Sequence, residues 1–161
     1  MNKVIYTYTG DMNFTESEVT SVSFNSFEEF YKGLGDKVAK KLGCDKEAVE
    51  IVKVSGYSEK CYAKVSYRLH FEIDKDVIRM NVCEKIPFEV KDFEIKAVED
   101  RLCKVTVTIN CFRDDKEAWQ KKLVPAKAEE KLKAILPSGL IPKVTYYINY
   151  PITTTGKFII E

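Results

Sequence analysis

The sequence predicts an α+β protein, in which one or two amphipathic helices pack on a face of antiparallel sheet. Residues 61–73 and 103–111 alternate apolar and polar side chains, which is typical of long strands with one buried and one exposed face. Residues 27–42 instead repeat their apolar side chains at helical spacing. An exposed sheet face favours antiparallel pairing, because parallel sheets are usually covered on both sides.

The N-terminal half is predicted to hold one helix among several strands. Shorter alternating stretches predict these strands at residues 3–9, 19–24 and 49–55. Ser26 and Glu29 have the spacing of a capping box, which opens a helix, and Gly43 is the residue expected to end it. The apolar face of this helix is expected to consist of Phe27, Phe30, Tyr31, Leu34, Val38 and Leu42.

The C-terminal half is predicted to hold strands at residues 77–83, 86–97, 143–150 and 158–160. Within residues 86–97 the alternation changes phase after Val90, which indicates a bulge or two strands joined by a bend.

A second helix is predicted from about Ala126 to Leu136, because Pro125 suits a first helical turn and Pro137 ends a helix. Its inward side chains are expected to be Ala128, Leu132 and Ile135. Residues 113–124 allow two structures. Asp114 and Asp115 either turn a hairpin whose second arm holds Trp119, Lys121 and Leu123, or cap a short helix.

The length of 161 residues suits a single α+β domain over residues 1–161, with a possible subdivision into 1–84 and 85–161. The 26 basic and 25 acidic side chains give a net charge of +1, which argues against nucleic acid as a partner. The N-terminus lacks the apolar segment of a signal peptide, and no apolar run reaches the ~20 residues of a membrane span. We therefore expect a cytoplasmic protein with no membrane association.

The five cysteines and the single histidine, His70, do not have metal-ligand spacing. Cys61, Cys103 and Cys111 fall on the apolar phase of their strands, where a free cysteine acts as a small hydrophobic residue. We expect all of them, with Cys44 and Cys83, to be reduced and structural, and we expect no metal and no cofactor.

The C-terminal segment carries one local pattern. Leu136-Pro137 is followed by Ile141-Pro142-Lys143, an apolar stretch, Pro151 and Thr153-Thr154-Thr155-Gly156-Lys157. Residues 136–157 resemble the end of the C-terminal lid domain of adenylate-forming enzymes, the acyl-CoA synthetases and adenylation domains. That family has a helix ending in Leu-Pro, an Ile-Pro-Lys-like step, a strand and a Pro-x-Thr-x-x-Gly-Lys loop.

The resemblance implies that Lys157 is the catalytic lysine that stabilises charge where a carboxylate attacks the α-phosphate of ATP. Gly156 would allow the loop its turn, and Thr153 and Thr155 would belong to the substrate-binding approach. Residues 1–90 do not resemble the family's large nucleotide-binding domain, so such a lid would act in trans with a separate partner. The alternative is a polar turn at Thr155-Gly156-Lys157 before a short strand.

Two functions from different classes follow. The first is a small binding or assembly domain that is not an enzyme on its own, with a protein partner or self-association through exposed aromatic side chains such as Tyr62, Phe112 and Tyr147. The second is the stand-alone lid-like domain. A hydrolase using Asp114 with Asp115, or Glu129 with Glu130, has less support, because adjacent carboxylates are normally solvated.

Overall fold

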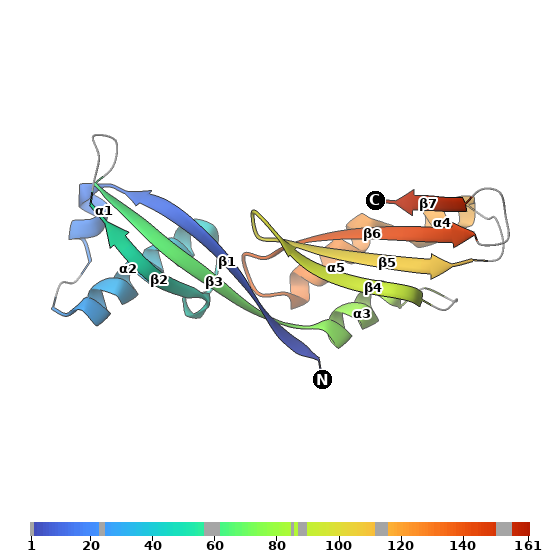
Figure 1. Ribbon diagram of the computed structural model, residues 1–161, viewed down its shortest axis with the longest axis horizontal. Helices are drawn as coiled ribbons and strands as arrows, with labels where there is room; N and C mark the ends of the chain where they lie inside the picture. The colour runs from blue at the N-terminus through green and yellow to red at the C-terminus, as the bar shows by residue number, and fades with distance from the viewer. Residues whose placement is uncertain are drawn as a thin grey trace. The chain divides into compact units, whose positions relative to one another are not determined.

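The computed structural model describes residues 2–22, 25–56, 62–84, 86, 90–111, 116–150 and 156–161, and it confirms the α+β class (Figure 1). Contacts divide the chain into two compact units. The N-terminal unit comprises residues 5–72 and 137–139, and the C-terminal unit comprises residues 1–4, 73–136 and 140–161. The point between residues 84 and 85 lies inside the C-terminal unit.

The N-terminal unit holds a three-stranded sheet in the order β1-β3-β2, with β1 Lys3–Phe14, β2 Val49–Ser55 and β3 Ala63–Asp74. Helix α2 (Phe27–Leu42) packs beside β2, and the short helix η1 (Lys46–Ala48) leads from one to the other. The predicted alternation of β3 is confirmed, because its odd-numbered residues face the core. The core around the helix contains Phe14, Val19, Val22, Leu34, Val38, Ala63 and Val65.

The strand predicted at residues 19–24 is wrong over the described residues 19–22, because Glu16–Thr20 form helix α1, and residues 23 and 24 lie outside the described residues. The Thr15 hydroxyl accepts the amide of Glu18 at 3.3 Å, while the Glu18 carboxylate accepts the amide of Thr15 at 3.1 Å. This capping box satisfies backbone donors that a strand would have to pair elsewhere.

Helix α2 begins and ends as predicted. The Ser26 hydroxyl accepts the Glu29 amide at 3.1 Å, and Gly43 closes the helix in the left-handed conformation at φ 70°. Phe27 departs from the predicted apolar face, since it is 84% exposed. It occupies the first helical position, one turn before the residues that reach the sheet.

The C-terminal unit holds a four-stranded sheet in the order β4-β5-β6-β7. Its strands are β4 Val90–Val98, β5 Leu102–Asn110, β6 Ile141–Tyr150 and β7 Gly156–Ile160. Strands β4 and β7 pair antiparallel with their neighbours, but β5 and β6 pair parallel. The expectation of antiparallel pairing is therefore wrong for this central pair, because a helical crossover brings the chain back to the start of the sheet.

The predicted bulge after Val90 is confirmed by a register shift between Val90 and Asp92 in the pairing of β4 with β5. The strand predicted at residues 77–83 is wrong, because Lys75–Cys83 form helix α3. The Asp74 carboxylate accepts the amides of Asp76 and Val77 at 3.0 and 3.4 Å, which fixes the start of this helix.

The crossover contains helices α4 (Lys116–Lys122) and α5 (Pro125–Ile135). The helical alternative for residues 113–124 is thus confirmed over 116–122, and the hairpin arm is wrong. In α5, Ala128 and Leu132 are buried as predicted, but Ile135 in the last turn is 44% exposed. Among the described residues, no helix has the length and apolar character that a membrane crossing requires.

Candidate functional site

Helices cover one face of the β4–β7 sheet, and within the described part of the C-terminal unit no helix covers the other face. Helices α4 and α5 lie behind the sheet in Figure 1. The side chains that face this helical layer are buried, among them Val105 and Val107 of β5 and Val144, Tyr146 and Ile148 of β6. Alternate residues of the same strands project from the opposite face, which we call the open face.

Lys157, the lysine that the sequence singles out, lies on this open face. It is the second residue of β7, where Asn149 of β6 is its cross-strand partner. Its Nζ lies 5.9 Å from the centroid of the Tyr147 ring, within the range of a cation–π contact. The preceding Gly156 has φ 71°, a conformation that favours glycine. Thr153 and Thr155 lie outside the described residues.

Two amides adjoin Lys157. The Asn149 side-chain Nδ2 donates to Oδ1 of Asn110 at 3.0 Å, and these two residues are cross-strand partners on β6 and β5. Lys157, Tyr147 and the two asparagines therefore form a polar end of the open face, with a cation, a phenol and two amides at adjacent positions. The arrangement provides a cation and several hydrogen-bond donors on one surface.

A second group of side chains was not singled out by the sequence. Lys96 of β4, Lys104 of β5 and Lys143 of β6 are successive cross-strand partners, so they form one row across three strands. All three are exposed. Of these three lysines, only Lys96 has a carboxylate partner among the described residues, the Glu94 side chain at 3.5 Å. We call these three residues the lysine row.

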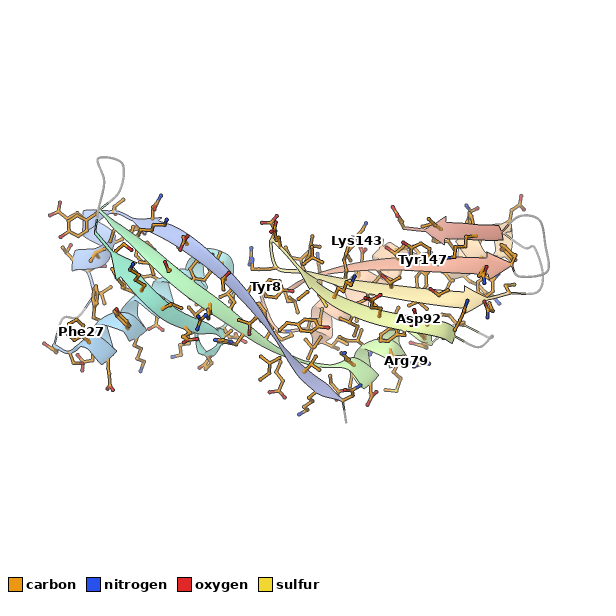
Figure 2. All side chains as sticks on the ribbon, in the orientation of Figure 1. Tyr8, Phe27, Arg79, Asp92, Lys143 and Tyr147 are labelled. Atoms are coloured by element: carbon orange, nitrogen blue, oxygen red, sulfur yellow. The ribbon has the colours of Figure 1, made fainter. Side chains whose placement is uncertain are left out.

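An apolar row lies directly beside the lysine row. Val98, Leu102 and Ile141 are the next cross-strand partners toward one end of the sheet. Val98 and Leu102 are half-buried, and Ile141 is 42% exposed. The open face thus presents a strip of positive charge next to a strip of apolar surface. Figure 2 shows Lys143 and Tyr147 projecting from β6, and Asp92 from β4.

The other candidate residues have structural partners. His70 lies on the polar phase of β3, where its Nε2 is 2.7 Å from Glu50 Oε2 and its Nδ1 is 3.2 Å from the Thr7 hydroxyl. Glu129 accepts the backbone amide of Val144 at 3.1 Å, and this bond satisfies a donor of β6 that lies beyond the end of the β7 pairing. Glu130 is exposed, and Asp114 and Asp115 lie outside the described residues.

The cysteines divide by burial. Cys103 and Cys111 are buried as predicted, Cys44 and Cys83 are half-buried, and all four are free thiols. Burial raises the pKa of the Cys103 thiol to about 11, and the Cys111 sulfur accepts the indole N–H of Trp119 at 3.3 Å. Cys61 lies outside the described residues, and the described part of the chain contains no group of histidine, cysteine and carboxylate side chains suited to a metal ion.

The sequence predicts three exposed aromatic side chains, and these residues differ in their exposure in the structure. Tyr62 is 39% exposed at the start of β3, and Tyr147 is half-buried on the open face. Phe112 lies outside the described residues. Of the three, Tyr147 is the one beside the lysine that the sequence singled out.

Comparison of the chain with protein-family profiles, with characterised proteins and with solved structures found no match.

Proposed function

We propose that the protein is a binding domain, not an enzyme on its own, and that its open face binds an acidic, amphipathic segment of another protein. The observation that carries this proposal is the lysine row. Like charges at directly opposed positions destabilise a sheet, so a row of three lysines is costly to the free protein. A partner that brings carboxylates to the row removes this cost.

The apolar row next to the lysines favours a protein over a nucleic acid as the partner. A nucleic acid would match the lysines with phosphates, but it would not use the apolar surface of Ile141, which is 42% exposed. A protein segment with carboxylates beside an apolar stripe matches both strips at once. The chain's overall charge of +1 also provides little of the long-range attraction that nucleic-acid binding uses.

The proposal is tested with a synthetic helical peptide that carries leucine on one face and glutamate along its flank. Backbone amide shifts of the full chain would be followed by NMR as this peptide is added. We expect the shifts to concentrate on Lys96, Lys104, Lys143 and the adjacent apolar row. Binding should weaken steeply as salt is added, because the lysines are exposed and screened.

A pair of matched variants and two control ligands make the test decisive. Lys104→Glu should weaken binding about tenfold, which corresponds to about 1.4 kcal/mol. The matched variant Lys133→Glu reverses an exposed lysine of α5, on the other side of the sheet, and should leave binding unchanged. Equal binding of a peptide with lysine in place of glutamate contradicts the proposal. Tighter binding of a single-stranded oligonucleotide at the same face would favour nucleic acid instead.

The lid-like domain acting in trans is a second candidate. It is supported by the order of elements over residues 125–150, since α5 ends before Leu136-Pro137 and β6 begins at Ile141, as in the resemblance. Lys157 also fits, because its exposed ammonium contacts the Tyr147 ring at the end of the sheet rather than a carboxylate of the described residues. A free ammonium on a long side chain can meet developing phosphate charge.

This candidate predicts that tagged protein recovered from its native host captures a separate adenylating protein. The captured material should catalyse carboxylate-dependent exchange between ATP and pyrophosphate. Lys157→Ala should abolish the exchange while capture persists, whereas Lys121→Ala on α4 should leave both unchanged. Exchange that is absent, or that is equal for wild type and Lys157→Ala, would refute a catalytic role for Lys157.

A further inference from the structure

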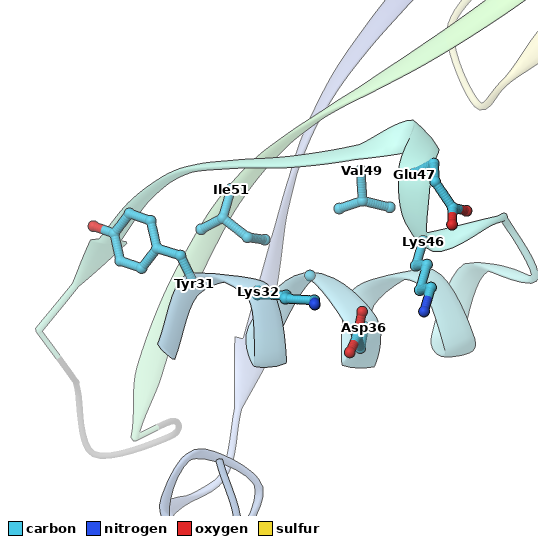
Figure 3. Close-up of a pocket in the computed structure, with 8 residues that line it drawn as sticks. Tyr31, Lys32, Asp36, Lys46, Glu47, Val49 and Ile51 are labelled. Atoms are coloured by element: carbon cyan, nitrogen blue, oxygen red, sulfur yellow. The ribbon is translucent and has the colours of Figure 1, made fainter. Parts of the chain in front are cut away.

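The N-terminal unit contains a cleft that is lined only by residues of that unit. It lies between helix α2 and strand β2 and has a volume of about 450 Å³. Figure 3 shows Val49 and Ile51 of β2 above the cleft, and the residues of α2 below it. The lining consists of Tyr31, Lys32, Gly35, Asp36, Lys46, Glu47, Val49 and Ile51.

Strand β2 is an edge strand. In the described sheet order β1-β3-β2, its only strand partner is β3, so its other edge offers unpaired backbone donors and acceptors. The pairing is regular from Val49 to Ile51, and a register shift follows before Lys53. The cleft runs beside this regular part, between the free edge and the helix.

Gly35 shapes the floor of the cleft. A Cβ atom at this position would lie 3.8 Å from Ile51 Cγ1 and 4.0 Å from Val49 Cγ1. Any longer side chain would therefore fill the space between α2 and β2. Glycine costs an α-helix about 1 kcal/mol relative to alanine, so the open floor is retained at the expense of helix stability.

The charges around the cleft indicate the kind of occupant. Lys32 and Lys46 are matched in number by Asp36 and Glu47, so the rim attracts neither a polyanion nor a polycation. The apolar side of the lining comes from Val49, Ile51 and the Tyr31 ring. An occupant must bring apolar side chains to the inner side and backbone groups to the strand edge, and an extended strand does both because its side chains alternate.

We propose that the cleft between α2 and β2 binds an extended peptide segment of a partner protein, which adds to the sheet as a fourth strand beside β2. Main-chain hydrogen bonds to Val49–Ile51 hold the segment, and its alternate apolar side chains enter the space above Gly35. The regular edge is short, so binding is expected to be weak and transient.

The probe is a blocked peptide that alternates valine with threonine between terminal lysines, added to the full chain. Amide shifts should be confined to Lys46–Ser55 and to the cleft-lining turns of α2. Gly35→Leu should weaken binding at least about tenfold, because the leucine side chain occupies the cleft. The matched variant Lys40→Leu adds the same side chain to an exposed position of α2 that does not line the cleft, and should bind as wild type does.

Peptide N-methylation provides a test that does not depend on the folding of a variant. Two peptides are methylated at every second amide, one in each phase. Because only one edge of the added strand faces β2, one phase should abolish binding and the other should retain it. Equal binding of both, or no shifts in the cleft at about 1 mM peptide, overturns the proposal. If the free protein is a dimer whose β2 amides resist exchange, the occupant is a second copy, and the proposal is likewise wrong.

Discussion

Lys104 on β5 and Lys143 on β6 are direct cross-strand partners in the parallel pair at the centre of the C-terminal sheet. Both ammonium groups are exposed, and Lys96 extends the same row on β4. The register of the two strands brings these charges together, because Lys104 and Lys143 lie far apart in the sequence.

This relationship predicts that Lys104→Gln stabilises the free protein. The change removes the central charge of the row, so the free energy of unfolding should rise by about 0.2–1 kcal/mol at low salt. The gain should disappear near 1 M salt, where the screening length falls to about 3 Å. Urea unfolding at both salt concentrations measures the effect.

Lys157→Gln is the control for this prediction. Lys157 also lies on the open face, but its cross-strand partner is the uncharged Asn149. Its neutralisation relieves no repulsion and removes the contact with Tyr147, so stability should stay equal or fall slightly. A comparable rise for both variants would mean that general charge reduction, and not the row, is responsible.

A second prediction concerns Gly33 in α2. A Cβ atom at this position would lie 2.3 Å from Cγ1 of the buried Val22, whose branched side chain has little freedom to move. Gly33→Ala should therefore destabilise the protein by about 1–3 kcal/mol, although alanine favours helices. Thermal or urea unfolding of the variant checks this.

Gly35→Ala provides the comparison within the same helix. Its Cβ would make only ordinary contacts, at 3.8 and 4.0 Å, so the variant should gain up to about 1 kcal/mol from helix propensity. Val22→Ala should reduce the penalty of Gly33→Ala in the double variant. Equal effects of the two glycine substitutions would show that the contact with Val22 does not govern Gly33.

The sequence predicted the features that depend on local periodicity. The alternation of β3 and β5 and the bulge after Val90 are visible because side chains on a strand repeat every second residue. The same periodicity wrongly predicts strands where short helices are rich in β-branched residues. In α1 and α3, the capping side chains of Thr15 and Asp74 decide the conformation, and they lie outside the apolar stretches that predict strands.

The lysine row could not be predicted from one sequence. Lys104 and Lys143 are recognisable as residues on polar phases, but their opposition requires the parallel register of β5 and β6. Helices α4 and α5 separate these strands, and nothing local in the sequence sets that register. Lys157 was singled out by a local pattern, while its contact with Tyr147 again depends on strand pairing.

Cys103 predicts a loss of stability in alkali. Burial raises its pKa from the ordinary value of 9.0 to about 11, so the fold favours the neutral thiol. This contribution is fully present below pH 9.0 and is lost as the pH rises toward 11. Cys103→Ala should unfold more readily than wild type at neutral pH, because it leaves a small cavity, but should lose less stability across this range.

Tyr146 serves as the reference for that experiment. Burial also raises the pKa of its phenol, whose hydroxyl donates to the carbonyl of Val82 at 2.9 Å. Tyr146→Phe should therefore flatten the same alkaline decline at higher pH than Cys103→Ala does. An alkaline decline that is identical in wild type and Cys103→Ala would contradict the prediction, because it would show that the pKa of this thiol does not differ between the folded and unfolded states.

Glu18 predicts a loss of stability in acid. The hydrogen bond from the Lys41 ammonium, followed by that from the Thr15 backbone, holds the pKa of this carboxyl below its ordinary value of 4.5. The stabilisation of the fold by the Glu18 carboxylate is therefore present above pH 4.5, and it is lost as the pH falls through the lowered pKa of this group. Glu18→Gln should lower the free energy of unfolding at neutral pH by up to about 1 kcal/mol, because the pair is partly exposed.

Urea midpoints at neutral pH and below pH 4.5 separate this effect from general acid destabilisation. The difference between wild type and Glu18→Gln should shrink in acid, since protonated glutamate resembles glutamine in charge. Glu16→Gln removes a carboxylate from the same helical turn while keeping the bonds of Glu18 to Lys41 and Thr15. A constant difference across the pH range would mean that the charged pair does not stabilise the start of α1, and that glutamine perturbs the cap by its shape alone.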